Sequence, residues 1–254
     1  MLVLKLYNNI MNKTVLTHFY NEEYLLPWWL DHHKKYFDHG ILIDYASTDK
    51  SVEIIKEICP TWTVVKSKNE FFGAKLCDEE IIDHESTVPG WKIALNITEF
   101  LVGDYSILND TPNQYHIMPC CVMIDDSPNT IPDINLPLIK QKLNGMHYLE
   151  GSKSIRRSRI IHNKPLYVYP LGRHFDKDHT TEDLVILWYG WSPFNETIIK
   201  RKLQIQSKIP QSDVARGYGT QHIVTEQQLQ EQYTKLYLRS RDLSKEQFLK
   251  KEFI

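Results

Sequence analysis

The chain has 254 residues, of which 42% are hydrophobic and 24% are charged, a composition that excludes a disordered or low-complexity protein. Lys and Arg total 30 against 32 Asp and Glu, and this balance predicts neither a nucleic-acid partner nor general attraction to anionic lipid. Any anionic ligand must therefore be held by local contacts.

The sequence shows no targeting signal and no CxxC cysteine pair, and both observations predict a protein of the cytoplasm. No apolar run is long enough for a transmembrane segment, and residues 1–16 lack the apolar core and cleavage site of a signal peptide. Cys59, Cys77, Cys120 and Cys121 form no CxxC pair, so we expect reduced thiols.

Short apolar runs alternate with helix-like segments over the first hundred residues. The runs are rich in β-branched and aromatic residues, and they have the length of buried strands. The alternation predicts an α/β fold with a mostly parallel sheet flanked by helices, which binds ligands beyond the carboxyl ends of its strands. We expect strands at residues 14–20, 40–46, 61–67 and 91–97, and helices at 28–37, 47–59 and 74–84.

The pattern loosens after residue 103. Residues 104–137 carry many Pro, Asn and Asp residues and predict long loops with an occasional strand, such as one at 116–124. Residues 225–254 are expected to form a docked helical tail, with capping boxes at Thr225 and Gln228 and at Ser244 and Gln247.

Polar residues follow three of the expected strands. They would meet at one edge of the sheet, where a ligand could bind. Turn closure, helix capping and hydrogen bonding to neighbouring loops are the structural alternatives. The residues are Asn21 and Glu22 after the first strand, Asp44 at the end of the second, and Asn96, Thr98 and Glu99 after the fourth.

Asn96 begins Asn-Ile-Thr, the acceptor pattern for N-linked sugar. Its neighbours Trp91, Ile93 and Leu95 predict a buried strand, whereas glycosylation needs an exposed loop in a secreted protein. We therefore favour a binding role for Asn96.

The segment VLTHFYNEEYLLPWWLDHHKKYFDHGILIDYASTDKSVEIIKE, residues 15–57, resembles the opening of glycosyltransferase family 2-like proteins of the GT-A fold. In that family an Asn-Glu follows strand one, and an Asp-rich turn with Ser-Thr-Asp-x-Ser follows strand two. The resemblance implies one GT-A-like domain over 1–224, with a nucleotide-sugar-binding half at 14–102 and a looser acceptor and catalytic half at 103–224. The tail at 225–254 would follow it.

The fourth strand departs from the family pattern. Relatives carry an Asp-x-Asp motif there, often followed by Glu-Phe, whereas this chain reads NITEF at residues 96–100. Asn96 and Thr98 keep oxygen donors but remove two charges, which weakens a site for a divalent cation such as Mn²⁺ or Mg²⁺. Glu99 keeps one carboxylate, and His174 and His222 are further candidate metal ligands. His162, Arg173 or Arg216 could otherwise stabilise the leaving group.

The resemblance implies transfer of a sugar, with inversion, from a nucleotide-sugar donor to a hydroxyl of a glycan or glycoprotein acceptor. Such transfer needs a carboxylate that accepts the proton of the attacking hydroxyl, and Asp213 is preferred to Glu182 and Asp183. The candidate catalytic residues are Asp213, Glu99 and His222; the candidate donor-binding residues are Asn21, Glu22, Asp44, Asn96, Thr98, Arg173 and Trp191.

Two other functions remain open. The loss of Asp-x-Asp is compatible with a GT-A-like protein that binds nucleotide or glycan without catalysing transfer. A metal-dependent hydrolase would instead use the cluster at residues 174–179, with His174, Asp176, Asp178 and His179 as ligands. Trp188 and Trp191 could stack on sugar rings or belong to the core.

Overall fold

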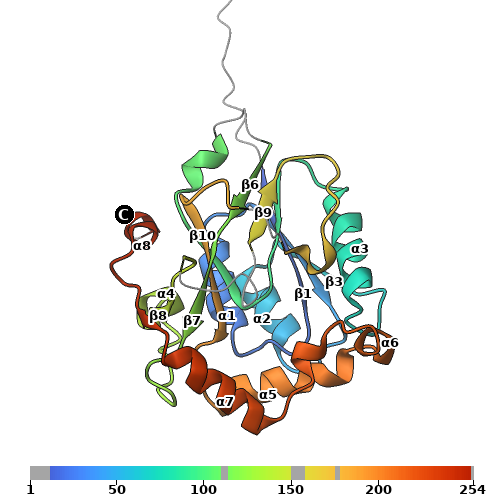
Figure 1. The fold of residues 1–254 in the computed structure, drawn as a ribbon. Coiled ribbons are helices and arrows are strands. Elements are labelled where there is room, and N and C mark those ends of the chain that lie inside the picture. Colours follow the sequence, from blue (N-terminus) through green and yellow to red (C-terminus); the bar gives the residue numbers. More distant parts are fainter. Residues whose placement is uncertain (1–11, 110–113, 150–157, 175–177, 253–254) are drawn as a thin grey trace, which may run out of the picture.

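A computed structural model of the chain describes residues 12–109, 114–149, 158–174 and 178–252 (Figure 1). They form a mixed α/β fold flanked by helices, as the alternating pattern predicts, but their strands make two sheets and not one. Cys59, Cys77, Cys120 and Cys121 are all buried and free of disulfides. No helix within these ranges is both long and apolar enough to cross a bilayer.

The first sheet contains the four expected strands. It has the order β3-β2-β1-β4-β9-β6, and β1 to β4 run parallel. β9 pairs antiparallel with both β4 and β6. The strands are β1 (Lys13–Phe19), β2 (His39–Asp44), β3 (Thr63–Lys66), β4 (Trp91–Ala94), β6 (Tyr115–Met118) and β9 (Arg159–His162).

The second sheet has the order β11-β8-β7-β10-β5. β10 pairs in parallel with β7 and antiparallel with β5, which follows β4 directly in the chain. The strands are β5 (Glu99–Gly103), β7 (Cys120–Ile124), β8 (Asn144–Met146), β10 (Leu184–Trp191) and β11 (Arg241–Asp242).

Eight α-helices and four short 3₁₀ helices lie in the described residues. The α-helices are α1 (Leu26–His33), α2 (Ser51–Ile58), α3 (Ala74–Glu85), α4 (Leu138–Gln141), α5 (Glu196–Gln204), α6 (Gln211–Val214), α7 (Glu226–Tyr237) and α8 (Gln247–Glu252); the 3₁₀ helices are η1 (Tyr105–Asn109), η2 (Leu171–Arg173), η3 (Ile205–Lys208) and η4 (Thr220–His222).

The core follows from the alternation of side chains along the strands. Val15 and Leu42 belong to the core shared by α1, α2 and the second sheet. Leu16 and Ile43 face the other way and pack with Ile81 of α3. The first sheet is therefore covered on both faces, as expected for parallel strands.

The expected strand at residues 116–124 is divided between the two sheets. β6 ends at Met118, Pro119 interrupts the run, and β7 begins at Cys120. Proline has no N–H for a ladder hydrogen bond, which explains a break at this position. The single-strand prediction was therefore wrong.

The tail is only partly helical. α7 has the capping box expected at Thr225 and Gln228. The second expected box does not form, because α8 begins at Gln247 itself and Ser244 N donates to Asp242 Oδ1 over 2.8 Å. Between the two helices, β11 pairs with β8, so the tail also extends the second sheet.

Candidate functional site

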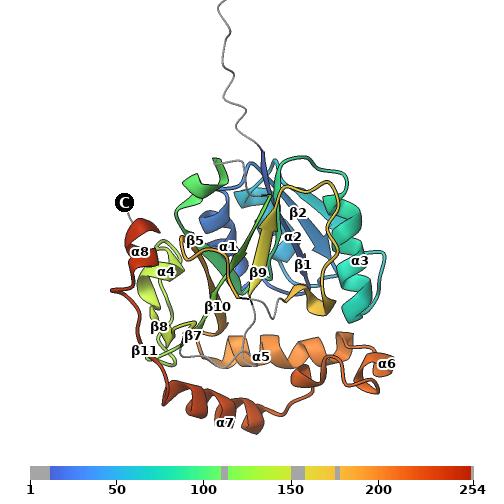
Figure 2. The same cartoon turned by 45° about the horizontal axis from the view of Figure 1, so that its top comes forward.

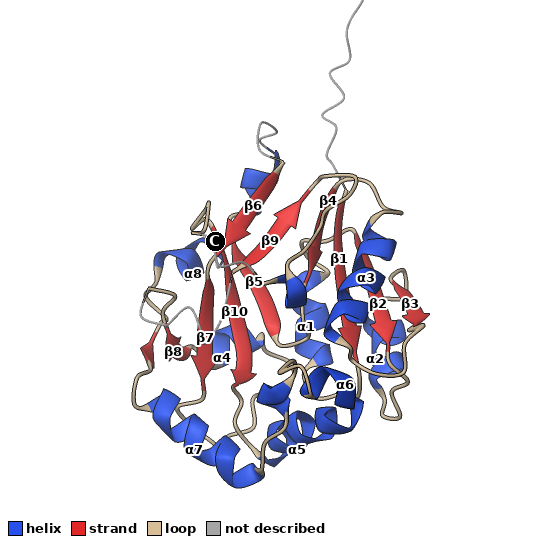
Figure 3. Cartoon of the chain, turned by 45° about the vertical axis from the view of Figure 1, so that its right-hand side comes forward, coloured by secondary structure: helices blue, strands red, loops and turns tan. Residues whose placement is uncertain are grey.

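The segment that follows β10 closes over the carboxyl ends of the parallel strands. Figures 2 and 3 show α5 and α6 lying across the end of the molecule where β1 and β2 finish. Lys208 O, at the end of η3, accepts from Phe72 N over 2.7 Å, and Asp213 of α6 accepts from Ala74 N over 2.9 Å. We call this end of the first sheet, with the segment that covers it, the carboxyl edge.

Asn21 connects three segments at this edge. Its Oδ1 accepts from the backbone N of Thr48 over 2.7 Å, and its own carbonyl accepts from Gln204 of α5 over 3.0 Å. Its φ of 51° lies in the left-handed region, which asparagine tolerates better than most residues. Asn21 therefore positions the turn after β2 and the end of α5.

Glu22 is buried and forms an ion pair with Arg201 of α5 through both carboxylate oxygens. Burial raises the pKa of Glu22, and the guanidinium of Arg201 opposes that shift. The carboxylate thus holds α5 against the end of β1, an arrangement that supports the edge and argues against direct donor contact.

Asp44 is the last residue of β2 and is only half-buried. Its Oδ1 accepts from Ser47 N over 2.8 Å and closes the turn that follows. Asp49, not Asp44, approaches the start of α2, where its Oδ1 accepts from Ser51 N over 3.0 Å. The nucleotide contact expected for Asp44 stays a prediction that its position at the edge permits.

The NITEF turn joins the two sheets between β4 and β5. Glu99 N donates to Asn96 O, and Asn96 N donates to Glu99 Oε2, each over 2.8 Å. Glu99 is 0% exposed, and its carboxylate accepts from Arg159 Nε over 3.1 Å and from Arg159 Nη2 over 3.0 Å. This buried ion pair argues against both the metal-ligand role and the catalytic role expected for Glu99.

Arg159 and Arg173 form a buried cationic group behind the turn. Arg159 donates to the carbonyl of Arg173 over 3.0 Å, and Arg173 forms an ion pair with Asp78 of α3. Burial, then Arg173, lowers the pKa of Arg159 to about 9. Arg173 Nη2 lies 3.4 Å from His18 Nδ1, so Arg173 reaches the end of β1 from within the protein.

The rings of two tryptophans in β10 lie against a lysine beside the NITEF turn. Trp188 Nε1 donates to Thr98 Oγ1 over 3.0 Å. The Lys202 ammonium lies 3.9 Å from the centre of the Trp191 ring and 5.9 Å from that of Trp188, which are cation–π distances. We call these four residues, with His222, the lysine–tryptophan cluster. Trp191 is buried, so it supports Lys202 instead of offering a face to a sugar.

The electrostatics of the cluster are set by burial and by neighbouring cations. Burial, then Arg201, lowers the pKa of Lys202 to about 7. Burial, then Lys202 and Arg201, lowers the pKa of His222 to about 4. His222 is therefore neutral at neutral pH, and Lys202 lies near the midpoint of its titration.

The Trp188 ring packs against Gly190, where only a residue without a side chain leaves room for it. A Cβ at Gly190 would lie 2.3 Å from ring atoms of Trp188, well inside van der Waals contact. The glycine between the two tryptophans is thus required by the packing of the lysine–tryptophan cluster.

The described residues among the expected metal ligands are not gathered into one site. Among the described residues, no group of three or more His, Cys, Asp or Glu is arranged to hold an ion. Glu99 is paired with Arg159, and His179 pairs with Glu182 over 2.9 Å. Asp178 is exposed, and Asp176 lies outside the described residues.

The sequence reasoning missed Lys202 and Arg201. They belong to the run Lys200-Arg201-Lys202, and α5 turns about 100° per residue, so neighbouring side chains face different ways. The Lys200 side chain is 80% exposed, whereas the other two face the protein. Only the register of α5, which begins after its Asn195 cap, could have separated them.

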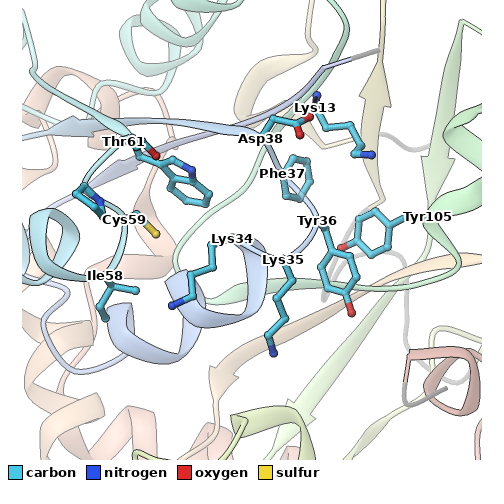
Figure 4. Close-up of a pocket in the computed structure, with 12 residues that line it drawn as sticks. Lys13, Lys34, Lys35, Tyr36, Phe37, Asp38, Ile58, Cys59, Thr61 and Tyr105 are labelled. Carbon is cyan, nitrogen blue, oxygen red and sulfur yellow. Dashed lines mark hydrogen bonds between the residues drawn. The ribbon is translucent and has the colours of Figure 1, made fainter. Parts of the chain in front are cut away.

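A hollow lies at the opposite end of the first sheet, where the parallel strands begin (Figure 4). Its volume is about 660 Å³, and Lys13, Lys34 and Lys35 line it with the stacked rings of Tyr36 and Tyr105. Its basic groups lie on the surface, and Lys34 is already paired with Asp31. We assign no role to this hollow.

Comparisons with known proteins give only distant likenesses. No family model matches the chain, and no curated protein matches it. S. aureus TarS 1–349 in complex with UDP-GlcNAc is 15% identical, with a TM-score of 0.31, over 48% of this chain and 37% of TarS. The same protein in complex with UDP is 13% identical, with a TM-score of 0.35, over 60% of this chain and 47% of TarS.

HddC from Yersinia pseudotuberculosis is 11% identical, with a TM-score of 0.31, over 46% of this chain and 60% of that protein. The chain therefore spans less than two thirds of each of these structures. At such TM-scores the likenesses carry no argument for function, which must rest on the residues of the carboxyl edge.

Proposed function

We propose that this chain is a glycosyltransferase that transfers a sugar from a nucleotide-sugar donor to a hydroxyl of a glycan or protein-linked acceptor, with inversion. The observation that carries the proposal is the meeting of the NITEF turn with Lys202 and its two tryptophans at the carboxyl edge. Open α/β sheets bind ligands at this edge, and the order β3-β2-β1-β4 places Asp44 and Asn96 on it.

The donor would lie along the ends of β2, β1 and β4. Asp44 would contact the base or ribose, and Asn96 and Thr98 would face the sugar phosphate. Glu22, Glu99 and Arg173 would act as supports, because each is already held in an ion pair. Asn21 would position the turn after β2 in the same way.

Inverting transfer is a single displacement. The acceptor oxygen bonds to the anomeric carbon while the bond from that carbon to the diphosphate oxygen breaks, and the diphosphate departs with the electron pair. Asp213 would accept the proton of the attacking hydroxyl. Asp213 lies on α6 at the carboxyl edge, and its Oδ2 accepts a hydrogen bond from Ala74 N.

The rival function is a GT-A-like protein that binds nucleotide or glycan without transfer. It is favoured by one observation, the replacement of the Asp-x-Asp carboxylates by Asn96 and Thr98 while Glu99 is held by Arg159. Release of nucleoside diphosphate in the presence of an acceptor distinguishes the two, because only the enzyme consumes the donor.

The first test is thermal unfolding with UDP, GDP, CDP and their common sugar conjugates, each in EDTA and in Mn²⁺. A ligand at one hundred times its dissociation constant stabilises a protein by about 2.7 kcal/mol. That stabilisation raises the melting temperature by several degrees in a domain of this size. We expect one nucleotide family to do so in EDTA.

Inorganic phosphate at matched ionic strength is the control for general anion effects. The proposed function would be contradicted if every anion raised the melting temperature equally. It would also be contradicted if none of the nucleotides raised it, either in EDTA or in Mn²⁺.

A further inference from the structure

Lys202 has an unusual setting for a lysine. Its ammonium lies against the Trp191 ring and near that of Trp188, and the whole side chain is only half-buried. Lysines normally extend into water, and holding this one on aromatic surface costs free energy of desolvation. An anionic ligand that met the ammonium would offset that cost.

In the described part of the chain, no carboxylate balances this charge. Among the described residues, none lies within ion-pair distance of Lys202. Glu22 is paired with Arg201, the neighbour of Lys202 in α5, and His222 is a nearby base that is itself neutral at neutral pH. The positive charge is therefore left for an anion that comes from outside.

The ammonium also lies beside the residues that replace the Asp-x-Asp carboxylates. Trp188 contacts Lys202 through its ring and Thr98 through its indole N–H, and Tyr189 N donates to Thr98 O over 2.7 Å. Two residues further along α5, Gln204 bonds to Asn21 at the end of β1. Lys202 thus lies on α5 between the ends of β1 and β4.

We propose that Lys202 binds the diphosphate of the donor and supplies, without a metal, the positive charge that a divalent cation would otherwise bring to the NITEF turn. This inference rests on the proposed function and adds a named residue to it. The tryptophans hold the ammonium in place, so that it meets the leaving group without a large loss of side-chain freedom.

The test compares the affinity of wild type and Lys202→Met for UDP, GDP and CDP by calorimetric titration in EDTA. Removing one charge-assisted contact weakens binding by roughly tenfold or more, so we expect at least that loss for the nucleotide that wild type prefers. Lys202→Arg keeps the charge and should retain most of the affinity.

Lys200→Met is the matched control, because it removes an exposed lysine from the same helix. We expect its affinity to equal that of wild type. Circular dichroism and the melting temperature of each variant show whether it is folded.

The outcomes separate this inference from the proposed function. If wild type binds a nucleotide in EDTA and Lys202→Met binds it equally well, the role of Lys202 is overturned and the proposed function stands. If wild type binds only with Mn²⁺, the metal-free role is overturned and the function again stands. If wild type binds none in either condition, both are overturned.

Discussion

Trp188 donates its indole N–H to the Thr98 hydroxyl over 3.0 Å, and this bond connects β10 to the NITEF turn. Trp188→Phe keeps an aromatic ring but removes the donor, and Thr98→Val removes the acceptor. We expect each change to lower the free energy of unfolding by about 1 kcal/mol, measured by urea denaturation. The double variant should lose less than the sum, and full additivity would show that the bond contributes nothing.

Gly190→Ala tests whether the position of the Trp188 ring matters for binding. The added methyl would collide with the ring, so Trp188 must move away from Lys202 and Thr98. We expect weaker nucleotide binding together with a lower melting temperature.

Gly40→Ala is the control, because its Cβ would lie 2.1 Å from Trp62 at the opposite end of the first sheet. Gly40→Ala should also lower the melting temperature, because it should reduce the free energy of unfolding by roughly 1 to 3 kcal/mol. It should leave the nucleotide affinity of the folded protein unchanged. Equal losses of affinity in the two variants would contradict the role of Trp188.

Glu99→Gln tests the support role of the buried ion pair. The variant leaves the Arg159 charge without its partner, which costs about 3 kcal/mol or more of unfolding free energy. Glu79→Gln breaks an exposed pair with Lys75 and should cost less than about 1 kcal/mol. Loss of donor turnover in Glu99→Gln at unchanged stability would instead favour the original catalytic assignment.

The pH dependence of stability should report the setting of Lys202. Its pKa is about 7 in the folded protein and 10.5 in an exposed lysine, so between these values the unfolded chain binds more protons. The free energy of unfolding contributed by this group therefore rises as pH increases from about 7 to about 10.

Lys202→Met should lack that rise. The facing groups are the Arg201 guanidinium and His222, whose pKa of about 4 places its own contribution at lower pH. Urea denaturation of both proteins across pH 6.5 to 10 gives the comparison, and parallel curves would contradict the buried setting of Lys202.

The sequence predicted the first sheet well because local signals suffice there. The four parallel strands are short apolar runs, and Pro27 in the first turn of α1 marks a helix start. It also placed Asp44 and Asn96 at strand ends, since the end of a buried run is visible in its polarity.

The ion pairs of the site could not be predicted in the same way. Glu99 pairs with Arg159 sixty residues later, and Glu22 pairs with Arg201 across 179 positions, so only the tertiary arrangement identifies the partners. The catalytic and metal-ligand roles of Glu99 were predicted from its position in the motif. In the structure its carboxylate is buried and paired with the Arg159 guanidinium, which argues for a supporting role. Lys202 was missed because its neighbours in the chain are basic as well.

The most direct measurement is hydrogen–deuterium exchange in EDTA, with and without each nucleotide sugar of the panel. We expect one donor to slow exchange at the ends of β1, β2 and β4, at or just after which Asn21, Asp44 and Asn96 lie, and along α5, which contains Lys202. Protection only around Lys34 and Lys35 at the opposite end of the sheet, or no protection by any donor, would contradict a nucleotide-sugar site at the carboxyl edge.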